Sequence, residues 1–129
     1  MASVLKVNTL TGVTTAGSIV VTGEGNSTTT SLQQGLAKAW AVSVSGASPL
    51  DSFNISSVTD NSTGNYDFTI SSAMANSNFV VCGMATGLNK VNGTSRASNT
   101  TTNIHVETRN QAEGLVDADA QPAILGDLA

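Results

Sequence analysis

From Ala39 onward, apolar and polar residues alternate with a period of two, and turn-forming residues interrupt this alternation at short intervals. The clearest segment is Tyr66-Asp67-Phe68-Thr69-Ile70, whose apolar side chains would share one face of an extended chain. Similar segments lie around residues 40–44, 53–55, 79–84, 100–108 and 115–126. Short strands separated by turns about every 8–12 residues are typical of an antiparallel β-sandwich. We therefore predict an all-β fold of six or seven strands, with the sandwich domain over residues 39–129.

Composition decides whether such a polar chain can fold at all. Ser, Thr, Asn and Gly make up 57 of the 129 residues, and charged residues only 11%. Leu, Ile, Val and Phe nevertheless make up 30 residues, a fraction above the roughly 20% below which disorder is expected. Val, Ile and Thr, which suit a pleated sheet, number 35. We expect the Ser, Thr and Asn residues in turns and on the outward positions of the strands.

The core predicted from these segments is thin. The chain has five aromatic residues, all expected in the core: Trp40, Phe53, Tyr66, Phe68 and Phe79. A small apolar core stabilises a domain weakly, so burial between identical chains would supplement it.

Several strands can be predicted individually. Phe53 and Ile55 are expected on one strand, residues 60–65 form a hairpin turn, and Ile104 and Val106 share a face of a later strand. Residues 79–84 are apolar on both faces, which favours a central strand. Pro122 belongs at an edge or a bulge, because it cannot donate a ladder hydrogen bond.

Residues 1–30 form an N-terminal arm without aromatic residues. Its apolar stretches, Val4–Leu10 and Ile19–Thr22, predict two short strands or extended pieces that need a neighbouring surface, although a structureless tether is the alternative. Over residues 31–38, Leu32 and Leu36 are spaced for one face of a short helix that continues to Trp40, and Ser31 with Gln34 matches a capping box. We predict a collar there. The expected contacts between copies of the chain are Leu5, Val7, Leu10, Ile19, Val21, Leu32 and Leu36.

Charge and hydropathy exclude several classes of partner. The five basic residues are scattered, so they cannot form the positive surface that nucleic acid requires. No apolar run reaches 18 residues, and the N-terminus lacks a signal-peptide pattern, so we expect neither membrane insertion nor a secretory signal. Cys82 lies in the apolar run FVVCGM, which predicts a buried, unreactive thiol.

Two groups of residues could carry chemistry. His105 and Glu107 would share one face of a strand, and in a three-fold assembly one His105 per chain could gather a metal. Asp117 and Asp119 would also share a strand face, as a calcium site or as the acid and base of a glycoside hydrolase. Neither group has enough ligands at suitable spacing. We predict a hydrogen-bonded or solvent-facing histidine and a solvated acidic edge.

No catalytic motif stands out. The chain lacks a Gly-x-Ser-x-Gly elbow, and its glycine-rich turns lack the Lys and Ser/Thr of a phosphate loop. We expect no enzymatic activity, no cofactor and no metal.

Six segments together carry a resemblance to a known family. They are Ser3–Leu10, Thr11–Gly17, Gly23–Thr30, Leu32–Trp40, the run Phe53–Tyr66 with its pattern N-x-S-x-x-T-D-N-x-T-G-x-Y, and the closing Gly126–Ala129. In this order they resemble short tail-fibre and fibre-like virion proteins of marine tailed bacteriophages.

This resemblance implies a homotrimer located in the virion. Residues 1–30 would join other virion proteins, and the β-sandwich would bind a saccharide or protein of the host surface. One departure is the polar segment 89–102, where family members often carry more Phe and Tyr. We predict a host-binding loop there, with the candidate residues Asn89, Asn92, Thr94, Arg96 and Asn99. A capsid decoration protein that stabilises the shell is the alternative function.

Overall fold

The computed structural model describes residues 4–12, 18–22, 29–45, 48–87, 90–94 and 98–129. The chain divides into two compact units, Met1–Leu36 and Ala37–Ala129. The predicted all-β class is confirmed, since the described strands form three antiparallel sheets.

The first unit contains one small sheet and one short helix. Strand β1 (Val20–Thr22) pairs antiparallel with β2 (Thr29–Ser31), and the backbone N–H of Leu32 donates to the carbonyl of Ile19. Helix α1 (Leu32–Gly35) follows directly. It is shorter than the predicted 31–38, because the chain enters strand β3 at Ala37 and Trp40 lies on that strand.

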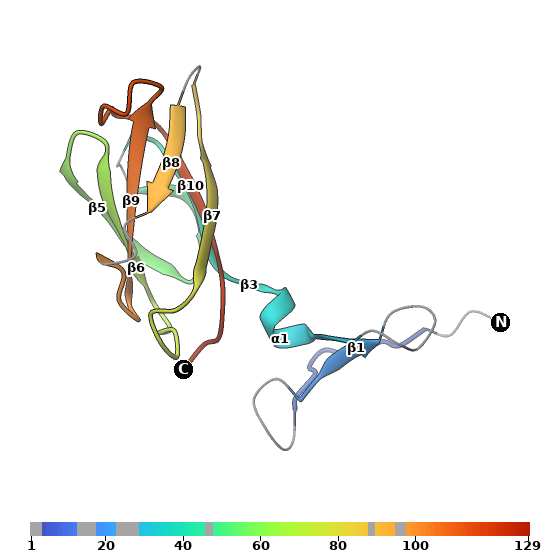
Figure 1. The fold of residues 1–129 in the computed structure, drawn as a ribbon. Helices are drawn as coiled ribbons and strands as arrows, with labels where there is room; N and C mark the ends of the chain where they lie inside the picture. The colour runs from blue at the N-terminus through green and yellow to red at the C-terminus, as the bar shows by residue number, and fades with distance from the viewer. Residues whose placement is uncertain (1–3, 13–17, 23–28, 46–47, 88–89, 95–97) are drawn as a thin grey trace. The chain divides into compact units, whose positions relative to one another are not determined.

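The second unit consists of two four-stranded sheets (Figure 1). One has the strand order β4-β3-β10-β7 and the other β5-β6-β9-β8. In chain order the strands are β3 Ala37–Ser43, β4 Pro49–Phe53, β5 Ile55–Ser62, β6 Asn65–Ile70, β7 Val80–Ala85, β8 Lys90–Thr94, β9 Asn103–Asn110 and β10 Ala120–Leu125. These eight strands exceed the predicted six or seven, because residues 53–55 belong to two strands and residues 90–94 form a strand.

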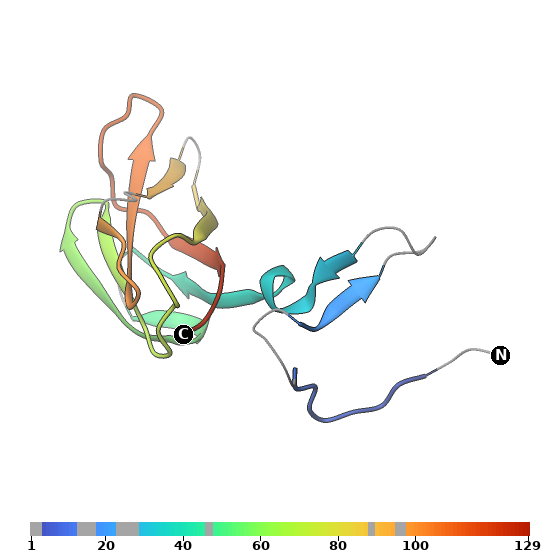
Figure 2. The ribbon, with the colours of Figure 1, turned by 60° about the horizontal axis from the view of Figure 1, so that its bottom comes forward.

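One apolar core joins the two sheets. Alternate residues of β6 and β9 supply its largest side chains, among them Tyr66, Phe68 and Ile104, each fully buried. From the other sheet β3 and β10 contribute Ala39, Ala41, Ala120 and Ile124. Because side chains from both sheets meet in one cluster, the sheets face each other as two layers (Figure 2).

Asn54 marks the passage of the chain from one sheet to the other. It has a φ of 58°, in the left-handed region, and separates β4 from β5. Its side-chain amide donates to the carbonyls of Lys38 and Ser72 and accepts from the backbone N–H of Ser72. Asn tolerates this conformation better than most residues. The prediction of one strand through Phe53 and Ile55 was therefore wrong.

Several further predictions about burial and position were wrong. Residues 80–85 form β7, the last strand in the order of its sheet, and Cys82 is exposed. Pro122 is buried within β10, a central strand, where it lies opposite Gly83. Gly83 has no side chain, so the facing position leaves room for the proline ring. On β3 the small residues Ala39, Ala41 and Ser43 face the core, while Trp40 is only half-buried and Phe53 on β4 is exposed.

Candidate functional site

The outer side of the β5-β6-β9-β8 sheet gathers ionisable and amide side chains from β6 and β9. On β9, Ile104, Val106 and Thr108 are buried, and the residues between them project from the opposite side. The backbone register places Asp67 of β6 directly opposite His105. We call this surface the polar face; it consists of Asp67, Asn103, His105, Glu107 and Arg109.

Asp67 and His105 form the first half of the polar face. The His105 Nδ1 lies 2.8 Å from the Asp67 Oδ1, and the two side chains are 13% and 30% exposed. Burial opposes ionisation of Asp67, but hydrogen bonds from His105, Asn61 and Asn103 outweigh it and lower the pKa of this carboxyl group. Asp67 is therefore a carboxylate at neutral pH, held by three neighbours.

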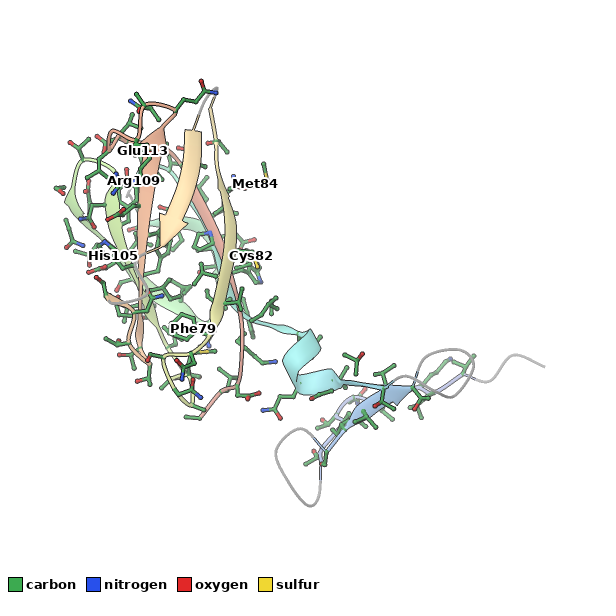
Figure 3. The ribbon with its side chains drawn as sticks, viewed as in Figure 1. Phe79, Cys82, Met84, His105, Arg109 and Glu113 are labelled. Carbon is green, nitrogen blue, oxygen red and sulfur yellow. The ribbon has the colours of Figure 1, made fainter. Side chains whose placement is uncertain are left out.

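Glu107 and Arg109 form the second half. The Arg109 Nε and Nη2 both donate to the Glu107 Oε2, at 3.0 and 2.6 Å, and its Nη1 donates to the carbonyl of Glu113. Glu107 also lies near His105, with 3.8 Å between its Oε1 and the histidine Nε2. Figure 3 shows Arg109 and Glu113 together at one end of β9, with His105 farther along the strand. Each side chain on the polar face is thus oriented by a charged or polar neighbour.

The neighbouring strand β8 has a glycine opposite the polar face. Gly93 lies opposite Glu107 in the register, and a Cβ built on Gly93 would meet no atom closer than 3.9 Å. The residue directly opposite Glu107 on β8 therefore contributes no side chain to this surface. The carboxylates, imidazole and guanidinium together offer both acceptors and donors on one surface.

The predicted host-binding loop is partly a strand. Asn92 and Thr94 lie on β8 and pair with Thr108 and Val106 of β9, so the expectation of a loop was wrong for them. Asn99 is half-buried, and its Oδ1 accepts a hydrogen bond from the backbone N–H of His105. It therefore holds the backbone of β9 in place at His105. Asn89 and Arg96 lie outside the described residues.

Asp117 and Asp119 have separate structural roles. Residues 116–119 precede β10 and are not part of a strand, so the predicted shared strand face was wrong. The Asp117 Oδ1 accepts from the Gly64 N–H at 2.7 Å and from the Tyr66 hydroxyl at 3.2 Å. The Asp119 Oδ2 accepts from the Thr86 hydroxyl at 2.6 Å. The two carboxylates therefore hold different parts of the fold and do not act as a pair.

Tyr66 and Thr108 complete the interactions around Asp117. Burial raises the pKa of the Tyr66 hydroxyl, which therefore stays protonated and donates its hydrogen bond. The buried Thr108 hydroxyl donates to the carbonyl of Val116. The bond from Tyr66 attaches the segment before β10 to β6, and the bond from Thr108 attaches it to β9.

Two other kinds of feature are absent from the described ranges. These ranges contain no group of three or more His, Cys, Asp and Glu side chains placed to hold a metal ion, and no helix long and apolar enough to cross a membrane.

Three members of the polar face, Asp67, Asn103 and Arg109, were not predicted from the sequence. Arg109 follows His105 and Glu107 at the same two-residue spacing, so the period of the strand was a usable signal. Asp67 had no such signal, because its position opposite His105 depends on the pairing of β6 with β9.

The expected contacts between copies in the first unit are mostly exposed. Leu5, Val7, Leu10, Val21 and Leu36 are more than half exposed, while Ile19 and Leu32 are half-buried. Comparisons with protein-family models, curated proteins and solved structures found no match to this chain.

Proposed function

We propose that this chain is a non-enzymatic structural protein of a bacteriophage virion. It is a homotrimeric tail fibre or fibre tip, with residues 1–30 attached to other virion proteins. The body, Ala37–Ala129, is an eight-stranded β-sandwich that binds the host cell surface. The observation that carries this proposal is the polar face, on which hydrogen bonds orient Asp67, His105, Glu107 and Arg109.

A surface of this kind suits a saccharide of the host envelope. Sugar hydroxyls both donate and accept, so carboxylates, guanidinium and amides in one area can replace their hydration shell. Side chains that are already oriented lose little conformational freedom on binding. Strand β8, which includes the predicted host contacts Asn92 and Thr94, pairs with β9 beside this surface.

The roles of Asp117 and Asp119 support a binding function over hydrolysis. A glycoside hydrolase needs two carboxyl groups facing one bond of the substrate. Here each aspartate accepts from a different part of the fold, Asp117 from Gly64 and Tyr66, and Asp119 from Thr86. The low charge content also suits a particle surface in a saline medium, where exposed ion pairs are screened.

The test is binding of the purified full-length chain to host cells and to polysaccharide extracted from their surface. We expect binding to both, and competition with adsorption of the phage. An Arg109→Gln variant should lose most of this binding while keeping its melting temperature within a few degrees. Asp119→Asn is the matched control, because Asp119 lies outside the polar face, and its binding should be unchanged.

Absence of binding and of competition contradicts the adhesive role. Electron microscopy of the particle then separates the tail from the shell. A regular lattice position on the capsid would favour the decoration function and contradict the tail-fibre assignment.

A further inference from the structure

A row of apolar residues crosses the outer side of the β4-β3-β10-β7 sheet from one edge to the other. The backbone register places Phe53 opposite Trp40, Trp40 opposite Ala123, and Ala123 opposite Cys82. Cross-strand partners project from the same side of a sheet, so these four residues form one row. We call this surface the apolar face. Beside the row it includes Val42, Val80, Met84 and Leu125, and its polar members are Gln121, opposite Met84, and Asp51, opposite Val42.

Large side chains lie on the apolar face while small ones fill the core behind it. Phe53 is 53% exposed, Val80 61% and Met84 71%, whereas Ala39 and Ala41 on the inner side are almost completely buried. Figure 3 shows Cys82 and Met84 on the side of β7 that faces away from β9. An extended apolar surface of this kind marks an interaction site.

Few charged residues lie near the row. The row contains no charged residue, and Asp51 lies at its β4 margin, opposite Val42. Lys38, two residues before Trp40, is 5% exposed. Each chain carries a net charge of −4, so copies repel each other least where they meet through this face.

The area of the face can be compared with what a stable interface needs. With strands about 4.8 Å apart and residues about 3.3 Å apart, four strands of six residues span about 400 Å². A standard stable interface buries about 800 Å² per partner. The face therefore supplies about half of the area that one partner buries in such an interface.

The first unit of the same chain also leaves large apolar residues uncovered, Leu5 at 80% and Leu10 at 54% among them. Association of identical chains can cover both surfaces at once.

We infer that the apolar face packs against copies of this chain, so that the sandwich bodies themselves form part of the trimer interface. This inference rests on the proposed homotrimer. In a closed ring of three chains, each contact joins two different surface patches of the subunit. In the inferred arrangement, the β4 edge with Phe53 meets the β7 edge with Val80, Cys82 and Met84 of the next copy. An aromatic ring against a thioether is a favourable pairing.

Cys82 is the sole cysteine of the chain and lies in the row, so its thiol reports on the interface. The experiment measures the rate at which a thiol reagent labels Cys82 in the full-length protein, together with the mass of the particle in solution. We expect a trimer whose Cys82 reacts at least tenfold more slowly than in the unfolded chain. A Cys82→Ser/Ser57→Cys variant is the control. Its thiol lies on β5 at an exposed position and should react rapidly in the trimer.

A charge placed on the face should separate the copies. Met84→Lys is expected to shift the protein toward monomer, and Ser57→Lys, an exposed position in the other sheet, should not. Because Met84 is 71% exposed, the substitution leaves the core of the chain intact.

A disulfide tests which edges meet. In one chain Asp51 and Cys82 lie on the two outermost strands, about 14 Å apart by strand spacing, whereas a disulfide joins Cα atoms within about 7 Å. Mild oxidation of an Asp51→Cys variant should therefore link different copies and give covalent trimers on a denaturing gel.

The outcomes separate the interface from the proposed function. A trimer with rapid labelling of Cys82 overturns the apolar face as interface but leaves the homotrimer standing. A monomer overturns both the interface and the homotrimer. Rapid labelling of Cys82 in that monomer means that the apolar face is exposed, and slow labelling means that the chain covers its own face. A trimer unaffected by Met84→Lys, or disulfides only between two Cys82 residues, also contradicts the inference.

Discussion

Asp117 accepts a hydrogen bond from the backbone N–H of Gly64, 53 residues earlier in the chain, at 2.7 Å. Gly64 lies in the turn between β5 and β6, with a φ of 65°. Its carbonyl accepts from the N–H of Thr108, so the turn contacts β9 as well. This turn is the point where the hairpin, β9 and the segment before β10 are joined.

Gly64→Ala should therefore destabilise the fold. A Cβ there would lie 2.6 Å from the Thr108 carbonyl oxygen and 2.6 Å from the Val116 nitrogen, both backbone atoms, and the positive φ adds strain. We expect a loss of about 1–3 kcal/mol in the free energy of unfolding, measured by chemical denaturation. Gly93→Ala is the control. Its Cβ would make only an ordinary contact, 3.9 Å from the Glu107 carbonyl oxygen, and an unchanged or higher stability is expected. Equal stability of the two variants would contradict this account of the turn.

Truncation of Phe68 should test the position of the core. Phe68 is fully buried between the sheets, so Phe68→Ala should cost about 3–5 kcal/mol. Leu50 is 73% exposed, and Leu50→Ala should change the free energy of unfolding by less than about 0.5 kcal/mol. Thermal or denaturant unfolding of both variants measures these changes in the free energy of unfolding. A small effect at Phe68 would show that the two sheets do not share this core.

The bond between Asp67 and His105 predicts a stability that depends on pH. The pKa of Asp67 is lower in the folded chain than the unfolded value of about 3.9. Its contribution is therefore fully present above that unfolded value and is lost as the pH falls through the folded pKa. We expect Asp67→Asn to be less stable than the natural chain near pH 6, and this difference to shrink in acid.

A double-mutant cycle of Asp67→Asn and His105→Gln separates their interaction from other effects. We expect a measurable coupling energy near pH 6, from urea unfolding of the four proteins. Strictly additive effects of the two substitutions would show that the 2.8 Å contact contributes nothing to stability.

Removal of residues 1–30 should weaken the trimer without unfolding the body. All residues of the core cluster lie between Ala39 and Leu128, so the second unit keeps its core. The truncation removes exposed apolar residues, Leu5, Leu10 and Val21 among them, that have no cover within one chain. Sedimentation of the truncated chain should show a trimer that dissociates on dilution. Its thermal unfolding should remain cooperative. An equally stable trimer after truncation would refute the predicted role of this segment.

The polar face shows how far local pattern reaches. The two-residue period of β9 buries Ile104 and Val106 and places His105 and Glu107 together on the other side, as predicted. Asp67 joins them only through the pairing of β6 with β9. Asn99 was chosen as a host contact from composition, yet its side chain holds the backbone of His105. Composition does not tell a surface amide from a supporting one.

Strand β3 shows where hydrophobicity by itself misleads. Trp40 and Val42 are the larger side chains, and a single chain would be expected to bury them. The structure instead buries Ala39, Ala41 and Ser43, because Tyr66 and Phe68 from the facing sheet already occupy the space between the layers. Hydrophobicity by itself also led to the wrong predictions for Cys82 and residues 79–84.

By itself, the sequence determined the all-β class, the β5–β6 hairpin and the burial of alternate residues on β6 and β9. Each depends on backbone geometry and neighbours close in the chain. Only the tertiary structure decided that Asn54 leads the chain into a second sheet, that Asp67 meets His105, and which side of β3 faces the core. These outcomes depend on the volume between two sheets and on pairing between distant strands, and a local pattern contains neither.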